Sequence, residues 1–157
     1  MDIILLSIGK VSSSWIKEGI SLFESRIEKY LKFVNKELPD IKNGKSLAID
    51  KIKELEGKIL ISEFCSSDIV VLLDEKGKEF SSRDFSVWVQ KQLSTGKKRL
   101  IFVIGGPYGF SEEVYKKADF KISLSKMTFT HEMAKLFFTE QIYRAMTILK
   151  GEPYHHD

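Results

Sequence analysis

The sequence predicts an α/β fold with a mostly parallel sheet and helices on both of its faces. Short apolar runs alternate with longer stretches of helical periodicity from one end of the chain to the other. Two of these runs, Ile69–Leu73 and Leu100–Ile104, are almost entirely apolar, as expected of strands buried on both faces. No linker, repeat or low-complexity segment interrupts the alternation. We therefore expect residues 1–157 to form a single domain.

The first part of the chain predicts a strand, a helix and a second strand. Ile3–Ile8 is a short apolar run. From Trp15 to Leu31 apolar residues recur at helical spacing, and Ser14 precedes them as a candidate N-cap. Phe33–Leu38 is the second predicted strand, and Pro39 ends it.

The middle of the chain adds a helix, a strand and another helix. Apolar residues between Leu47 and Leu60 follow a helical period. The apolar run Ile69–Leu73 comes next, and the polar segment Asp74–Lys78 is expected to turn the chain. Ser81, with Asp84 three residues later, resembles a capping box and predicts that a helix begins there.

The last part predicts a strand, a short helix, a short strand and a long helix. Leu100–Ile104 is the strand, and it leads into a glycine-rich turn. Ser111 caps a short helix that ends at Ala118, and Lys121–Ser125 forms the last strand. The final helix covers His131–Lys150 and is stopped by the glycine and proline that follow it.

Composition and charge exclude several classes of protein. Lys and Arg number 25 against 22 Asp and Glu, and a net charge of +3 indicates nucleic-acid binding only if the charge is clustered. The single cysteine, Cys65, excludes an intrachain disulfide and a Cys-based zinc site, and we expect it to pack in the core. The three histidines lack the spacing of zinc ligands, so no metal site is predicted. Without a signal peptide or a long apolar run, we expect a cytoplasmic protein with no membrane partner.

Ligands of open α/β sheets bind beyond the carboxyl ends of the strands, which makes three segments candidates for a site. These segments are Leu73–Asp74, Ile104–Gly106 and Leu124–Ser125. In Gly105–Gly109 the adjacent glycines either let a cofactor approach the backbone or form a tight turn. Leu124–Glu132 either holds an adenosine between apolar walls or connects two elements, with Thr130 as a helix N-cap.

The final helix is apolar nearly all round, so it must be covered on most of its faces. We expect part of this cover to come from a second copy of the chain, with Phe138 as a candidate contact. Glu140 and Arg144 lie among these apolar residues, where a charged group is either part of an ion pair or catalytic. The tail after Pro153 is polar and aromatic, and it either docks on the domain or stays disordered.

Several motifs occur together, in order, over essentially the full length. They are Gly9-Lys10, Leu73-Asp74 with Gly77-Lys78, the run from Phe102 to Gly109, the run from Leu124 to Phe129, the stretch Glu140–Ala145 and the ending Gly151–His155. In this combination the chain resembles the ribosomal RNA large subunit methyltransferase H family, of the SPOUT class. Typical members have proline where Thr130 stands, which we expect to alter the stiffness of the loop.

The resemblance implies a function, a fold detail and a set of contacts. It implies S-adenosylmethionine as cofactor and N3 of a pseudouridine in 23S rRNA, within the assembled 70S ribosome, as methyl acceptor. It also implies a homodimer and a deep trefoil knot in the C-terminal half. Carried over by position, the cofactor contacts fall on Leu73, Gly105, Leu124, Ser125, Lys126, Met127, Thr128 and Phe129.

Methyl transfer requires the acceptor nitrogen to lie in line with the S–CH₃ bond and to lose its proton. We expect His155 to be the base, because imidazole titrates near neutral pH. Tyr154 is expected to stack on the pseudouridine, and Arg144 to bind phosphate or brace the dimer. Lys97–Arg99 are further candidates for contacts with RNA.

Two alternative functions stay open on the sequence. One is another SPOUT methyltransferase, acting on tRNA or on a ribose 2′-OH. The other is a ribosome-binding factor that has kept the fold without catalysis. S-adenosylmethionine binding separates the second from an enzyme, and the identity of the methylated nucleotide separates the first.

Overall fold

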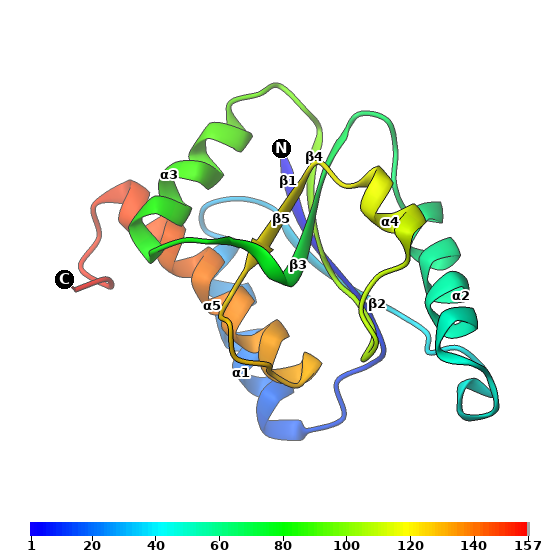
Figure 1. Cartoon of the computed structure of the whole chain (residues 1–157). Helices are drawn as coiled ribbons and strands as arrows, with labels where there is room; N and C mark the ends of the chain where they lie inside the picture. The colour runs from blue at the N-terminus through cyan, green and yellow to red at the C-terminus, as the bar shows by residue number, and fades with distance from the viewer. Residues whose placement is uncertain (157) are drawn as a thin grey trace.

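The computed structural model describes residues 1–156 as a sheet between two layers of helices (Figure 1). Within these residues five strands form one sheet in the order β2-β1-β4-β3-β5, and all neighbouring strands are parallel. The strands are β1 (Asp2–Ile8), β2 (Phe33–Leu38), β3 (Asp68–Glu79), β4 (Arg99–Ile104) and β5 (Phe120–Ser123). The helices are α1 (Ser14–Ile27), the 3₁₀ turn η1 (Gly44–Ser46), α2 (Ile49–Ser62), α3 (Ser82–Leu93), α4 (Glu112–Lys117) and α5 (His131–Lys150). The predicted alternation and the parallel sheet are therefore confirmed.

The direction of each crossover along the sheet decides which face its helix covers. α1 and α3 each connect two adjacent strands in the direction of the β2 edge, whereas α2 and α4 carry the chain toward the β5 edge. Because parallel crossovers share one hand, these two pairs must lie on opposite faces. α5 joins the face of α1 and α3 and packs against both (Figure 1). None of the helices within residues 1–156 is long and apolar enough to cross a bilayer.

Each face of the sheet has its own core. On the face of α5, the rings of Phe102 and Phe138 lie 4.6 Å apart between centroids, and both are fully buried. On the opposite face, Val114 of α4 and Leu60 of α2 cover Val103 and its neighbours. Phe138 is therefore a core residue and not the intersubunit contact expected from the sequence. The residue before it, Phe137, is 42% exposed.

The structure corrects the expected turn at Asp74–Lys78. β3 continues through this segment to Glu79, and both Leu73 and Lys78 pair with Ile122 of β5, so the residues between them bulge out of the ladder. A Cβ on Gly77 would lie 2.6 Å from the backbone of Ile122. Polar residues predicted a turn that ends the strand here, but the chain returns to β5 after this bulge and resumes its pairing at Lys78. Only glycine permits the close approach at position 77.

Two other local expectations were wrong. Cys65 is exposed after the end of α2 and is not a core residue. Ser14 is the first residue of α1 and does not cap it, and the N-cap residue Ser13 makes no side-chain bond to the helix. Instead Glu132, at the start of α5, accepts hydrogen bonds from the backbone N–H of Ser12 and from the Ser13 hydroxyl at 2.8 Å. A carboxylate from a distant helix therefore holds the two residues that lead into the N-terminus of α1.

A buried ion pair fixes α5 against the carboxyl ends of β1 and β2. Lys135 is 1% exposed, and its Nζ lies 3.0 Å from Oε1 of Glu37 in β2. The same Nζ donates to the carbonyl of Gly9 at 2.8 Å, and Glu37 Oε1 also accepts from the N–H of Val11 at 3.1 Å. An ammonium as far from water as that of Lys135 is tolerated only when it is paired and hydrogen-bonded, whereas Glu37 keeps 26% of its side chain exposed. The contact therefore sets the position of α5 relative to one edge of the sheet.

We predict that Lys135→Met lowers the free energy of unfolding by about 3 kcal/mol, because it leaves the Glu37 carboxylate without its cation. The double variant with Glu37→Gln should recover part of this loss, since neither charge then remains unpaired. Lys58→Met is the control, because Lys58 pairs with Glu54 on the exposed face of α2 and should cost less than about 0.5 kcal/mol. Urea unfolding measures all three. Equal effects of Lys135→Met and Lys58→Met would contradict the assignment.

The Glu132 carboxylate predicts a sensitivity to acid. Its pKa is lowered from 4.5 to about 2, because the Ser12 N–H and the Ser13 hydroxyl donate to its charged form. The stability that it contributes is therefore complete above about pH 4.5 and is lost as the pH falls toward about 2. We predict that Glu132→Gln is less stable than the natural chain at pH 6, and that this difference shrinks over that interval. Thermal unfolding at a series of pH values tests this, and a constant difference would contradict it.

Candidate functional site

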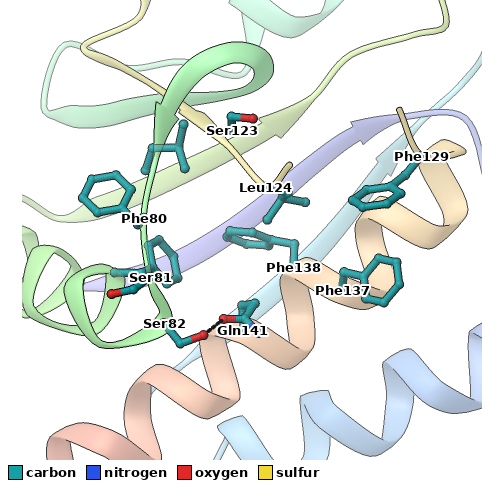
Figure 2. Close-up of a pocket in the computed structure, with 11 residues that line it drawn as sticks. Phe80, Ser81, Ser82, Ser123, Leu124, Phe129, Phe137, Phe138 and Gln141 are labelled. Atoms are coloured by element: carbon teal, nitrogen blue, oxygen red, sulfur yellow. Dashed lines mark hydrogen bonds between the residues drawn. The ribbon is translucent and has the colours of Figure 1, made fainter. Parts of the chain in front are cut away.

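A cavity of about 280 Å³ lies at the carboxyl end of β5, between the start of α3 and the middle of α5 (Figure 2). Its apolar walls are Phe80, Phe85, Ile122, Leu124, Phe129, Phe137 and Phe138, and its polar groups belong to Ser81, Ser82, Ser123 and Gln141. Aromatic walls with a few placed polar groups are typical of sites for small organic ligands. The cavity lies at the sheet edge where the sequence predicted a site.

The start of α3 forms the polar side of the cavity. Ser81 is the N-cap of α3, and its hydroxyl accepts a hydrogen bond from the N–H of Asp84 at 3.1 Å, which confirms the predicted cap. The hydroxyl of Ser82 donates to Oε1 of Gln141 in α5 at 2.8 Å (Figure 2). This bond ties the two helices together at the cavity.

The loop between β5 and α5 holds most of the residues predicted to contact a cofactor. Leu124 and Phe129, near its two ends, line the cavity (Figure 2). Ser123 donates to the carbonyl of Ser125 at 2.9 Å, and the Ser125 hydroxyl accepts from the N–H of Met127 at 3.0 Å. These local bonds shape a turn between the two lining residues. The three residues after Ser125 are exposed: Lys126, Met127 and Thr128. Their contacts with a ligand stay a prediction.

Thr130 ends this loop. It is the N-cap of α5, and its hydroxyl accepts from the N–H of Met133 at 3.3 Å. A threonine therefore performs here a capping function that proline, which lacks a side-chain acceptor, does not provide. The sequence interpretation of Thr130 as a helix cap is confirmed.

The remaining predicted cofactor residues lie in the neighbouring strand ends. Leu73 packs in the core of the α5 face and pairs with Ile122, which lines the cavity. Gly105 follows β4, and a Cβ on it would lie 2.9 Å from the ring of Phe110. At Gly106 a Cβ would lie 2.4 Å from a carboxylate oxygen of Glu56, a buried side chain whose pKa is raised by its burial. The Phe110 ring therefore leaves no room for a Cβ at position 105, and a Cβ at position 106 would displace the Glu56 carboxylate. Contact of the Gly105 backbone with a cofactor stays a prediction.

The C-terminal tail doubles back along α5 and brings together the residues predicted to be catalytic. Nη1 of Arg144 lies 3.1 Å from Nδ1 of His155, and the guanidinium lies 4.8 Å from the centre of the Tyr154 ring. The Tyr154 hydroxyl donates to Oε1 of Glu140 at 2.9 Å. Tyr30, in the turn that follows α1, donates to the carboxylate of Glu152. The tail up to His155 is therefore docked on the domain.

The contact with Arg144 determines what His155 presents. A guanidinium has only N–H donors, so Nδ1 of His155 must accept and the neutral ring carries its proton on Nε2. In this arrangement His155 presents its Nε2–H as a hydrogen-bond donor. The predicted role as a base requires the ring to turn away from Arg144.

Charges at the tail are set by Glu140. Its hydrogen bond raises the pKa of Arg144 above the usual value, so the guanidinium stays charged. Burial, and then the same carboxylate, raise the pKa of Tyr154, so its hydroxyl stays protonated at neutral pH. The sequence placed Glu140 among the apolar residues of the final helix but did not reveal these contacts. The Glu140–Arg144 spacing of four residues signalled their pairing, whereas nothing in the sequence signalled that the tail returns to them.

Arg99 is held in an ion pair with Asp68. Its Nε and Nη2 bind the two carboxylate oxygens of Asp68 at 2.8 and 2.6 Å, and Nη2 also donates to the carbonyl of Glu63. Arg99 begins β4, so it lies at the amino edge of the sheet, opposite the cavity. Lys97 and Lys98 immediately precede it and are exposed. Contacts of Lys97, Lys98 and Arg99 with RNA stay a prediction.

The chain belongs to the SPOUT methyltransferase family. The family model described as "Predicted SPOUT methyltransferase" matches residues 1–155. The chain is 57% identical to the ribosomal RNA large subunit methyltransferase H of Christiangramia forsetii over 99% of both chains, and 53% identical to that of Parabacteroides distasonis over 100% of both. A solved structure, a probable methylase family protein from Haemophilus influenzae Rd KW20, aligns with a TM-score of 0.49 and 12% identity over 95% of this chain and 66% of that one. The family resemblance inferred from the motifs is confirmed, and the trefoil knot stays a prediction.

We predict that Gly105→Ala lowers the free energy of unfolding by about 1–3 kcal/mol, because the new methyl group meets the Phe110 ring. The double variant with Phe110→Leu should recover part of the loss. Gly44→Ala is the matched control, since no atom lies within 4 Å of its Cβ position, and we expect a change below about 0.5 kcal/mol. Urea unfolding measures the three variants. A Gly105→Ala protein of unchanged stability would contradict this assignment.

Proposed function

We propose that this chain transfers the methyl group of S-adenosylmethionine to N3 of a pseudouridine in 23S rRNA, within the assembled 70S ribosome. Relatives matched over their full length are named ribosomal RNA large subunit methyltransferase H. The observation that carries the proposal is the junction of the cavity with the tail. Gln141 lines the cavity and donates to Glu140 at 2.8 Å, and Glu140 binds both Arg144 and Tyr154.

The cavity fits this cofactor in its chemistry. Its aromatic walls suit an adenine ring, while the Ser82 and Ser123 hydroxyls and the Gln141 amide supply polar groups for the ribose and the amino-acid moiety. When bound, the sulfonium supplies an activated methyl group. We propose that the residues contacting it are Leu73, Gly105, Leu124, Ser125, Lys126, Met127, Thr128 and Phe129.

The tail residues serve the acceptor. Loss of the N3 proton leaves negative charge on the pseudouridine, and the Arg144 guanidinium, kept charged by Glu140, stabilises that charge. Tyr154 contacts the base. His155 either donates a hydrogen bond from Nε2 to a carbonyl of the base while a water takes the N3 proton, or, turned away from Arg144, accepts the N3 proton itself. The protein thus orients and stabilises the acceptor and takes no part in a covalent intermediate.

We propose that residues 1–157 form one SPOUT methyltransferase domain that acts as a homodimer in the cytoplasm, where ribosomes are found. Support for the dimer comes from apolar side chains left exposed beside α5. Met127 is 77% exposed, and the rings of Phe129 and Phe137 lie 5.1 Å apart at 37% and 42% exposure. A second copy of the chain would remove this surface from water.

We predict that 70S ribosomes from a strain lacking this enzyme accept tritiated methyl groups much faster than free 23S rRNA or a short hairpin. A net charge of +3 gives a weak field, so the affinity must come from the shape of the ribosomal surface. Mass spectrometry of the labelled rRNA identifies the nucleotide and the methylated atom. Equal rates on ribosomes and on the hairpin would contradict the substrate proposal.

A chain that ends at Gly151 provides the second arm of this experiment. It lacks Tyr154 and His155 but keeps every residue that lines the cavity. We expect unchanged binding of S-adenosylmethionine in calorimetry and at least about a 10²-fold lower rate of transfer. A truncated chain with full activity would remove the tail from the site.

A further inference from the structure

Glu140 accepts four hydrogen bonds, which come from three side chains. Its Oε1 accepts from the Tyr154 hydroxyl and from Nη2 of Arg144. Its Oε2 accepts from Nε of Arg144 at 3.4 Å and from Nε2 of Gln141 at 2.8 Å. The side chain is 17% exposed, so these protein donors replace most of the water around it. Both carboxylate oxygens are therefore fully used by residues of α5 and the tail.

This geometry fixes the direction of the Arg144 guanidinium. Binding through Nε and Nη2 is the two-point arrangement that holds a guanidinium in one plane. With those nitrogens on Glu140, Nη1 is left to point at Nδ1 of His155. The same plane lies over the Tyr154 ring. One carboxylate thus determines the positions of three side chains, Arg144, Tyr154 and His155.

The same carboxylate adjoins the cavity. Gln141 donates to Glu140 and accepts from Ser82 at the start of α3. Gln141 and Ser82 lie in the cavity wall (Figure 2). α5 is already anchored elsewhere, by Lys135 and by the buried Phe138. A partly exposed ion pair four residues apart adds little to the stability of such a helix. The network around Glu140 therefore has its main effect on the tail and not on the fold.

We propose that Glu140 is a positioning residue, which holds Arg144, Tyr154 and His155 at the edge of the cavity in the arrangement that the acceptor nucleotide requires. The inference rests on the proposed function, because it assigns Glu140 to the same reaction. Glu140 itself acts only through its neighbours. Its loss should displace the tail while the cavity stays intact.

The test is Glu140→Gln, which keeps the shape of the side chain but removes its charge. We expect kcat on 70S ribosomes to fall by about 10²-fold, as a small displacement of reacting groups does. The Kd for S-adenosylmethionine in calorimetry should stay within about twofold, because no cavity wall changes. Exchange of the Tyr154 amide hydrogen, which bonds to the Glu152 carbonyl, should become about tenfold faster. Glu113→Gln, which breaks an exposed pair with Lys116 on α4, is the control and should change none of these.

Tyr154→Phe is the second variant, since it deletes one donor to Glu140 and keeps the ring that packs on Tyr143. If Glu140 acts through the tail, the double variant of Glu140→Gln and Tyr154→Phe will lose less kcat than the two single losses combined. The inference would be overturned if Glu140→Gln kept the Tyr154 amide exchange rate and the kcat of the natural chain. A loss of cofactor affinity equal to the loss of kcat would overturn it as well. If the natural chain methylates no ribosome, the proposed function fails. The amide exchange of residue 154 still decides the role of Glu140.

Discussion

The ammonium of Lys135, buried beneath α5, is the contact on which the arrangement of the site depends. It joins α5 to Glu37 of β2 and to the carbonyl of Gly9 after β1, so the last helix is held at the carboxyl edge of the sheet. Further along the same helix, α5 carries Gln141 into the cavity wall and Arg144 beneath the tail. Because a buried charge tolerates few positions, this contact restricts α5 more than apolar packing alone would.

Glu132 adds a second restraint at the start of the same helix. By accepting hydrogen bonds from Ser12 and Ser13 it couples the N-termini of α1 and α5, and the two helices then run side by side to the Phe23–Tyr143 ring contact. The loop before α5 is consequently fixed at both ends, by β5 and by this carboxylate. Phe129, which lines the cavity, lies in that loop. Polar contacts outside the cavity therefore fix the shape of the loop between β5 and α5.

The cavity and the tail are adjacent because α5 contributes to both. Ser82, Gln141 and Glu140 form a continuous chain of hydrogen bonds from the start of α3 to the tail. A ligand in the cavity and an acceptor at the tail would thus meet across one turn of helix, which is the proximity that a direct transfer between two substrates requires. The charged groups there are paired with one another, which agrees with a low net charge and with recognition by shape.

The sequence by itself determined the order of the elements, the two central strands and the caps at Ser81 and Thr130, since each depends on residues within a few positions. The tertiary structure alone decided that β3 extends past Leu73, that Phe138 faces the core while Phe137 faces outward, and that Glu140 meets the tail. The physical reason is that the residues in these contacts lie far apart along the chain. A periodic pattern shows that a face is apolar, but the pairing of β3 with β5 and of Ser12 with Glu132 joins residues far apart in the chain, and only the packed fold brings them into contact.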